Sequence, residues 1–299
     1  MTDITILTCK EFFTPKTASA YTDNIMLEYR LLKEALERIG LSVERTYWDD
    51  PNYNWSQTRA VVFRTIWDYF ERFETFWPWL QSIQTQTQII NSMKLIEWNI
   101  DKAYLFDLAQ CGIPIVPSIL IKKGQFQKLS EIAKKCDWTD LVVKPTISGG
   151  GYLTYKYGYT DLERYQAQFD ALVTERDMLV QGYVSSITEK GEASLMVFGG
   201  EFTHSILKRA KVGDFRVQDD FGGTVHPYQQ TPAEVALAKR VMKQCPELPI
   251  YGRVDLVWDN QDRPMVSELE IIEPELWVRK APWSADIFAK AIASQLLIN

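Results

Sequence analysis

The sequence predicts an α/β unit followed by α+β units in a chain of 299 residues, and three observations support this fold class. The chain is longer than one hydrophobic core usually fills, which favours two or three units. Strand and helix patterns alternate over roughly the first 90 residues, as in a parallel α/β layer. In the last third, neighbouring strand patterns are separated by hairpin-length gaps, which indicate antiparallel sheet. We place the units at 1–92, 93–180 and 181–299.

The first unit opens with a strand pattern at 4–8 and a helix pattern at 23–39, in which apolar residues recur at helical spacing. Gly40 follows at the position of a helix C-cap. Strand patterns at 41–48 and 60–67, an aromatic helix pattern at 71–83 and a strand pattern at 88–91 complete the unit. We therefore predict a small parallel sheet with helices between its strands.

The second unit is predicted to open with one helix at 94–109, ended by Gly112 and the prolines after it. The further elements of this unit follow in chain order: a strand at 119–121, a helix at 126–135, a hairpin at 141–157 and a helix at 161–174. The last third holds strands at 178–184, 192–198, 202–208, 251–258 and 265–272, and helices at 232–244 and from Ser284.

Composition excludes several classes of protein. The chain is 46% hydrophobic and 24% charged, as in globular proteins, and its net charge of -6 argues against nucleic acid or an anionic membrane as partner. Its four cysteines are far apart and form no C-x-x-C, so we expect neither a zinc site nor a disulfide scaffold. The N-terminus has no basic start and no apolar stretch approaches the ~20 residues of a membrane span. We expect a cytoplasmic protein.

The segment 251–274, Y-G-R-V-D-L-V-W-D-N-Q-D-R-P-M-V-S-E-L-E-I-I-E-P, carries the most chemistry. Side chains alternate along a strand, so Arg253 and Asp255 share one face, and Glu268 and Glu270 share a face of the next strand, which we expect to include Val266. Three carboxylates beside one arginine repel one another unless a cation is present, and Mg²⁺ prefers such ligands. An amphipathic hairpin with a solvated acidic face explains the pattern equally well.

A glycine-rich stretch, V-V-K-P-T-I-S-G-G-G-Y, follows an apolar strand pattern. A Walker-type loop needs its lysine after the last glycine, so the position of Lys144 excludes one. Lys144 at the end of a buried strand, and Lys102 before an apolar run, would be stabilised by an anion such as polyphosphate. The glycines could approach that anion with main-chain N–H groups, next to the Ser148 hydroxyl, and could close as a lid. Lysines that reach solvent and a plain turn are the alternatives.

A third segment, M-L-V-Q-G-Y-V, could offer main-chain N–H and C=O groups at 181–184 to a flat heterocycle. Glu189 or Glu192, in the E-K-G-E-A-S-L that follows, could accept hydrogen bonds from ribose hydroxyls. An ordinary strand, loop and strand is the alternative interpretation.

Taken in this order, the motifs resemble those of the ATP-grasp superfamily, on the side of D-alanine:D-alanine ligase and glutathione synthetase. The matching motifs are D-K at 101–102, V-V-K-P with S-G-G-G, L-V-Q-G-Y-V, G-E-A-S, and R-V-D with E-L-E. R-T-I-W-D-Y at 64–69, G-D-F-R-V-Q at 213–218 and E-I-I-E-P-E-L-W at 270–277 are most similar to the D-cycloserine-forming cyclo-ligase group. The resemblance implies a Rossmann-like N-terminal subdomain and ATP held between two α+β subdomains.

The resemblance also implies residue roles. The implied nucleotide-binding residues are Lys102, Lys144, Ser148, Gly149, Gly150, Gly151, Gln181, Gly182, Tyr183, Val184 and Glu192. The two lysines would hold the ATP phosphates, 148–151 would form a mobile loop above them, 181–184 would bind adenine and Glu192 would bind ribose. The implied Mg²⁺ ligands, with Mn²⁺ as a substitute, are Asp255, Glu268 and Glu270, and the catalytic residues are Arg253 and Lys144. Many members have asparagine in place of Glu270 and glutamate in place of Gln181.

The implied activity is that of an ATP-dependent carboxylate–amine ligase. ATP would phosphorylate the carboxylate of a small amino-acid-like substrate, and an amine would attack the acyl phosphate to form an amide, between two molecules or within one. An ATP-binding regulator or scaffold without turnover, and a kinase that stops at phosphoryl transfer, are the alternatives. The implied partners are a small acid and an amine, without nucleic acid or membrane, and a homo-oligomer is left open.

Substrate contacts are harder to place from the sequence. Arg64 and Asp68 could bind the charged ends of an amino acid, and Lys208 and Arg216 could bind a carboxylate or phosphate, although each could equally form a surface ion pair. We expect His204 to be a strand residue near the site rather than a base. The tryptophans at 67, 77, 79 and 277 are expected in the core or at interfaces.

Overall fold

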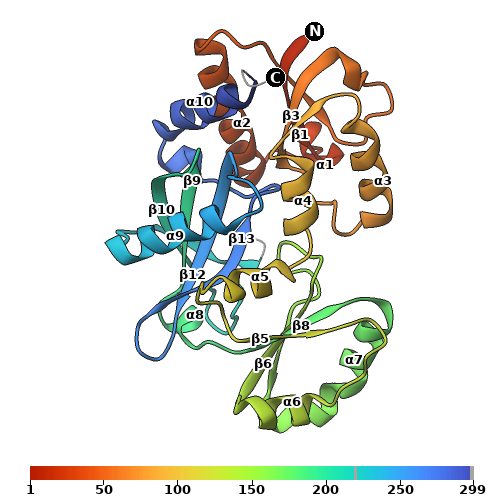
Figure 1. Ribbon diagram of the computed structural model, residues 1–299, viewed down its shortest axis with the longest axis vertical. Coiled ribbons are helices and arrows are strands. Elements are labelled where there is room, and N and C mark those ends of the chain that lie inside the picture. Colours follow the sequence, from red (N-terminus) through yellow and green to blue (C-terminus); the bar gives the residue numbers. More distant parts are fainter. Residues whose placement is uncertain (219–220, 297–299) are drawn as a thin grey trace.

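The computed structural model describes residues 1–218 and 221–296, which form three sheets and their covering helices (Figure 1). The first sheet is parallel, with the strand order β2-β1-β3-β4. Its strands are β1 (Thr2–Thr8), β2 (Val43–Tyr47), β3 (Thr58–Thr65) and β4 (Gln88–Ile90), and its helices are α1 (Lys10–Phe13), α2 (Ala20–Arg38) and α3 (Phe73–Ile83), with a 3-10 turn at Trp55–Gln57. The predicted parallel α/β layer is confirmed.

Helix α2 shows how local signals set an element's ends. Ser19 and Thr22 form a reciprocal capping box, which starts the helix at Ala20, three residues before the predicted start. Gly40 has a φ of +86° just after the helix, a conformation that glycine adopts without strain. The buried face, including Leu32 and Leu36, packs on the first sheet.

The central sheet is antiparallel, with the order β5-β8-β6-β7. It contains β5 (Ser118–Ile121), β6 (Asp140–Pro145), β7 (Tyr155–Gly158) and β8 (Met178–Gly182), with helices α6 (Leu129–Cys136) and α7 (Leu162–Glu175) and a 3-10 turn at Tyr159–Asp161. The helices cover one face, where Leu141, Val143 and Phe169 are buried in one cluster. The strands β6 and β7 form the predicted hairpin, joined by 146–154, which holds the glycines.

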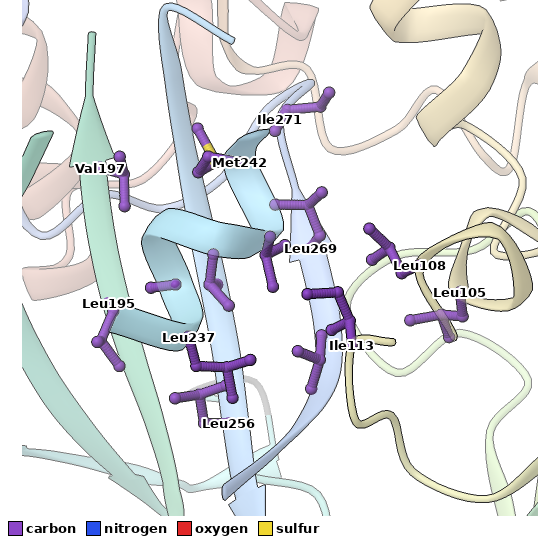
Figure 2. Close-up of a cluster of buried hydrophobic side chains, with 14 of the residues drawn as sticks. Leu105, Leu108, Ile113, Leu195, Val197, Leu237, Met242, Leu256, Leu269 and Ile271 are labelled. Carbon is purple, nitrogen blue, oxygen red and sulfur yellow. The ribbon is translucent and has the colours of Figure 1, made fainter. Parts of the chain in front are cut away.

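The third sheet is also antiparallel, with the order β11-β10-β9-β12-β13. Its strands are β9 (Glu192–Phe198), β10 (Glu201–Arg209), β11 (Thr224–Pro227), β12 (Tyr251–Trp258) and β13 (Pro264–Glu270), and its helices are α8 (Ser186–Glu189), α9 (Pro232–Gln244) and α10 (Ser284–Leu296), with a 3-10 turn at Val278–Lys280. Figure 2 shows Leu237 and Met242 of α9 lying over Leu195 of β9 and Leu269 of β13. Because the helix covers the apolar face, the polar face of β12 and β13 is left for the cleft described below.

Two predictions about secondary structure were wrong, one for the helix at 94–109 and one for the strand that contains Val266. The helix expected at 94–109 is two helices, α4 (Met93–Asn99) and α5 (Tyr104–Gln110). Between them the Asp101 carboxylate accepts hydrogen bonds from the Ala103 N–H, at 2.8 Å, and from the Thr146 hydroxyl, at 3.1 Å. The Lys102 N–H donates to the Thr146 carbonyl at 2.9 Å. The break therefore ties this segment to the central sheet and places Lys102 in the cleft.

The second wrong prediction concerns Val266. The strands β12 and β13 pair Asp255 with Glu268 but Leu256 with Val266, so β13 carries one extra residue, Ser267. This bulge shifts the alternation of side chains by one residue. Val266 is fully buried in the apolar cluster with Leu269, whereas Ser267 lines the cleft together with Glu268.

The remaining predicted elements are confirmed with small shifts at their ends, while α1, α8 and β11 were not foreseen. The unit boundaries at 92 and 180 remain a prediction, although β8 crosses the second of them and pairs only within the central sheet. The first and third sheets are joined by Asn91, whose amide donates to the carbonyls of Tyr251 and Ile271 at 2.9 and 2.7 Å. No helix within the described residues has the length and apolarity needed to span a bilayer.

Candidate active site

A cleft of about 1700 Å³ is lined by residues of all three sheets. It brings together almost every residue that the sequence singled out. The predicted site residues that line it are Asp68, Lys102, Lys144, Ser148, Gly149, Gly150, Gly151, Gln181, Gly182, Tyr183, Val184, Glu192, Lys208, Arg216, Arg253, Asp255, Glu268 and Glu270. Arg64 does not line the cleft, and neither does Glu189, the alternative to Glu192.

Arg253 and Asp255 lie at the centre of a buried charge network. The Arg253 guanidinium donates to both Asp255 oxygens, at 2.9 Å from Nε and 2.8 Å from Nη2, and also to Glu270. The Lys208 Nζ lies 3.1 Å from Asp255 Oδ2 and 2.6 Å from Glu192 Oε2. Burial alone would raise the pKa of Asp255, but Arg253 and Lys208 lower this pKa to about 2. Asp255 is therefore a carboxylate at neutral pH.

Glu268 and Glu270 face the cleft from β13, in register with Asp255 and Arg253. Glu268 lies 3.0 Å from the Lys102 Nζ, which also donates to the Ser148 carbonyl at 2.5 Å. Burial raises the pKa of Glu270 to about 8. The positive charge of Arg253 lowers this pKa, whereas the negative charges of Glu268 and Asp255 raise it further. The site would therefore be stabilised by additional positive charge.

Two charged side chains of the cleft are unlike the rest. Among the residues described, Lys144 and Glu273 are the only charged cleft residues that are not exposed and form no ion pair. Burial lowers the pKa of Lys144, and Lys102 adds to this shift while Glu268 opposes it. Burial raises the pKa of Glu273 to about 7. Each would be stabilised by a ligand group of opposite charge.

The glycine loop is held between aromatic side chains. The Ser148 hydroxyl donates to the Pro145 carbonyl at 3.0 Å, so it is not free in this arrangement. A Cβ atom on Gly149 would lie 2.7 Å from Cε1 of Phe70, in the first unit, and one on Gly151 would lie 2.8 Å from Cε2 of Phe221. Gly150 has a φ of +53° and open space around it. The glycines thus allow the loop to approach Phe70 and Phe221 closely.

Replacing Gly149 with alanine is expected to lower turnover about tenfold, because the added methyl group displaces the loop from Phe70. The unfolding free energy should change by less than about 1 kcal/mol, since Gly149 is half-buried in a loop outside the hydrophobic clusters. Gly150→Ala is the matched control, because its methyl group meets open space. At positive φ the alanine should cost about 1 kcal/mol of stability, but turnover should fall less than in Gly149→Ala. Steady-state rates and thermal unfolding of both variants would show this, and equal rates in the two variants would contradict the role of the Phe70 contact.

The segment 181–184 offers fewer free main-chain groups than expected. The N–H groups of Gly182 and Tyr183 donate to the Pro117 and Asp140 carbonyls at 3.2 and 2.9 Å. The Gln181 side chain donates to Ser118 at 2.8 Å. Within the described chain the Val184 N–H makes no such bond, which leaves it open to a ligand.

The expected substrate residues fare differently. Arg64 lies outside the cleft: its guanidinium donates to the Pro274 carbonyl at 2.9 Å and borders a separate cavity of about 30 Å³. Lys208 is engaged in the buried network described above. Arg216 lies over the Phe221 ring at 3.6 Å and pairs with Asp214 at 2.9 Å. Asp68 accepts hydrogen bonds from Trp48 and Arg72, at 2.7 and 2.9 Å.

Sequence reasoning missed several cleft residues. Glu273 lies in the quoted E-I-I-E-P segment, but strand alternation gave no reason to select it. Trp277 was expected in the core or at an interface, and it is buried but also lines the cleft, with its ring centre 5.3 Å from the Arg253 guanidinium carbon.

His204 lies on β10 as expected, where its Nε2 is 2.8 Å from the Leu276 carbonyl oxygen and burial lowers its pKa.

The carboxylates of Asp255, Glu268 and Glu270 are hard oxygen ligands of the kind that Mg²⁺ prefers. Within residues 1–218 and 221–296, no set of three or more His, Cys, Asp or Glu side chains is arranged as a metal site. Lysine or arginine engages each of the three carboxylates instead. The donor chemistry and the raised pKa of Glu270 fit a divalent ion that would displace these cations.

The fold and the cleft define a class of protein. Two antiparallel sheets face one cleft, one bearing Lys144 and the glycine loop and the other bearing Arg253 and the carboxylates. Cationic groups that hold phosphates, next to carboxylates that can hold metal ions, are typical of enzymes that transfer a phosphoryl group from a nucleotide.

Comparison with known proteins agrees with this class. Residues 102–292 match the RimK-like ATP-grasp domain, and residues 4–91 match the N-terminal domain of D-cycloserine synthetase DcsG. The cycloserine biosynthesis protein DcsG of Streptomyces lavendulae is 32% identical over 288 residues, which cover 89% of this chain and 92% of that protein. A crystal structure of D-cycloserine synthetase DcsG has a TM-score of 0.85 at 28% identity, over 98% of this chain and 99% of that chain. D-alanine–D-alanine ligase from Bacillus anthracis shares the fold, with a TM-score of 0.68 at 16% identity, over 99% and 98% of the two chains.

The chain therefore belongs to the RimK-like ATP-grasp family. It is an ATP-dependent ligase that joins a carboxylate to an amine and releases ADP, as the sequence predicted. The predicted fold, with ATP-grasp units after an N-terminal α/β unit, is confirmed.

Proposed function

We propose that this ligase closes a cyclic amide within one small amino-acid-like molecule, of the D-cycloserine type. The observation that carries the proposal is that the similarity to DcsG includes the N-terminal unit, residues 4–91. This unit lines the cleft with Phe12, Tyr21, Trp67 and Asp68. A shared substrate-facing unit supports a shared substrate class.

The reaction has two steps. The substrate carboxylate takes the γ-phosphoryl group of ATP, which forms an acyl phosphate and ADP. A nitrogen of the same molecule then attacks the carbonyl carbon, the bond to phosphate breaks, and the nitrogen loses a proton. Lys102 and Lys144 would hold the phosphates, and Arg253 would offset charge on the phosphoryl oxygens and on the tetrahedral intermediate. The loop at 148–151 would keep water from the acyl phosphate.

The other roles follow from the geometry of the cleft. Asp255, Glu268 and Glu270 would hold Mg²⁺, or Mn²⁺ in its place, which supplies positive charge to the phosphate oxygens. The Val184 main chain would contact adenine and Glu192 would contact ribose. We also propose a cytoplasmic location, because the reaction consumes ATP and the four cysteines are free thiols.

The test uses the ring-opened acid obtained by hydrolysing the ring amide of D-cycloserine. Purified protein with ATP, Mg²⁺ and this acid is expected to release ADP and to form D-cycloserine, detected by mass spectrometry. Added hydroxylamine should divert the acyl phosphate to a hydroxamate. If neither ADP nor hydroxamate forms, the proposed cyclisation is wrong.

A further inference from the structure

Glu273 is a buried carboxyl group of the cleft to which the reaction described above gives no role. It lies three residues after the end of β13, in a bend that Ile272 and Glu273 form, and it lines the cleft. Only 7% of the residue is exposed. A buried carboxylate without a counter-cation is costly, so the structure around Glu273 determines what kind of cation would suit it.

The backbone around Glu273 is held in place from several sides. The Trp67 indole N–H donates to the Glu273 carbonyl at 2.9 Å, and the Arg64 guanidinium donates to the Pro274 carbonyl at 2.9 Å. The Tyr251 hydroxyl donates to the Ile272 carbonyl at 2.8 Å. Because donors from other elements fix the carbonyls before and after it, the Glu273 side chain projects from a rigid segment, as preorganised binding requires. Arg64, which lies outside the cleft, thus helps to fix the main chain next to Glu273.

Within the described residues Glu273 forms no ion pair. The charges of Lys102, Arg253 and Arg64 reach it, but Lys102 pairs with Glu268 and Arg253 pairs with Asp255 and Glu270. The Arg64 guanidinium donates to the Pro274 carbonyl instead. Burial and the Glu268 charge outweigh these cations and raise the pKa of Glu273 to about 7. The nearby Glu273 carboxyl, after burial, raises the pKa of Tyr69 in turn. The Glu273 carboxyl is therefore buried without an ion pair among the described residues.

The surroundings of Glu273 indicate an organic cation rather than a metal ion. Trp67, which donates to the Glu273 carbonyl, and Tyr69, whose pKa the Glu273 carboxyl raises, belong to the N-terminal unit, and both line the cleft. Aromatic rings in the same cleft as a carboxylate suit an ammonium group, because the face of a ring attracts a cation. The carboxylates proposed for Mg²⁺ lie instead on the paired strands β12 and β13. Glu273 therefore lies on the substrate side of the cleft.

We propose that Glu273 binds the protonated α-amino group of an amino-acid substrate. The inference rests on the proposed function and adds a substrate requirement: the acid must carry an ammonium group beside the carboxyl group that is phosphorylated. The contact would hold the carboxyl group in a defined direction, because one carbon atom separates the two groups in an α-amino acid. Charge pairing in a water-poor cleft would make this contact selective against acids that lack the amino group.

The experiment compares two acids that differ only in the α-amino group. One is the ring-opened acid of D-cycloserine, and the other is 3-aminooxypropanoic acid. The wild-type kcat/KM for ADP release is expected to favour the first acid by about a hundredfold. In Glu273→Gln the kcat/KM for the first acid should fall about a hundredfold, while that for the second changes less than about threefold. Thermal unfolding should show a folded variant, because the substitution removes a buried charge.

Glu275→Gln is the matched control, since it makes the same change two residues away, where the Glu275 carboxylate pairs with Arg279 at 2.6 Å. It should keep the preference for the ammonium-bearing acid. An equal loss on both acids in Glu273→Gln, or no loss on either, would overturn the role of Glu273.

A different result separates this inference from the proposed function. If the wild type releases ADP with neither acid, the cyclisation is wrong, and calorimetric titration of D-alanine and of propionate decides the role of Glu273. Tighter binding of D-alanine than of propionate to the wild type, lost in Glu273→Gln, supports the ammonium site. Equal binding of D-alanine to both proteins, or no preference for D-alanine over propionate in the wild type, overturns it.

Discussion

Glu268→Gln is expected to lower turnover by roughly a thousandfold, a loss typical of removing one electrostatic contact to a transition state. Glu268 faces the cleft opposite Asp255 and pairs with Lys102 at 3.0 Å. The amide keeps the shape and one acceptor oxygen but loses the charge that would bind Mg²⁺ at the ATP phosphates. ADP release at saturating ATP and Mg²⁺ measures the loss.

Stability should change less than activity in this variant, because 23% of the Glu268 side chain is exposed and the amide oxygen can still accept from Lys102. Asp255→Asn should lose as much turnover, and also about 3 kcal/mol of stability, because Arg253 and Lys208 both lose a buried partner. Glu201→Gln, at the exposed start of β10, is the control and should behave as wild type. Activity above a tenth of wild type in both Glu268→Gln and Asp255→Asn would contradict the metal assignment.

Lys144→Met is the second substitution with a large expected effect: turnover should fall by about a hundredfold or more, and the KM for ATP should rise. Lys144 is the last residue but one of β6, close to the glycine loop, and has no ion pair in the described part of the chain, so the ATP phosphates are the anion that it can meet. The methionine fills a similar volume without charge. Initial rates over a range of ATP concentrations separate the two effects.

The same variant should be as stable as wild type, or more stable, because it removes a half-buried charge that forms no ion pair with residues 1–218 and 221–296. This combination of lost activity and kept stability distinguishes a ligand-binding lysine from a structural one. Lys122→Met, just after β5 of the same sheet, is the control, since Lys122 is half exposed and pairs with Asp177 at 2.7 Å. A clear loss of thermal stability in Lys144→Met without loss of turnover would contradict the phosphate role.

Most secondary structure could be read from the sequence because its signals are local. The helix α9 and the strand β12 begin and end at the predicted residues, since Thr231 and Glu234 form a capping box and the strand alternates apolar and polar side chains. The predicted helix at 94–109 failed because its break depends on Thr146, a residue distant in the chain, which bonds Asp101 and Lys102. No local pattern contains that contact.

The site shows the same division. The residue types and the order of Lys102, Lys144, Arg253, Asp255 and Glu268 were enough to predict the family and the activity. The sequence did not predict which of these residues form ion pairs with one another, because ion pairs join residues from different strands. Three features depend on how neighbouring segments pack. They are the bulge at Ser267, the pairing of Arg253 with Glu270, and the position of Arg64 outside the cleft.

The sequence by itself thus determined the class of fold, the ligase chemistry and most of the charged residues of the cleft, because strand alternation and motif order are properties of the chain. The tertiary structure alone decided which charges remain without a partner, since a counter-ion can come from any part of the molecule. Among the described cleft residues that are not exposed, the charged side chains without an ion pair are Lys144, a cation, and Glu273, an anion. The glycine loop beside Lys144 was found from the sequence, whereas Glu273 became visible only when the surrounding cations were seen to be engaged by other residues.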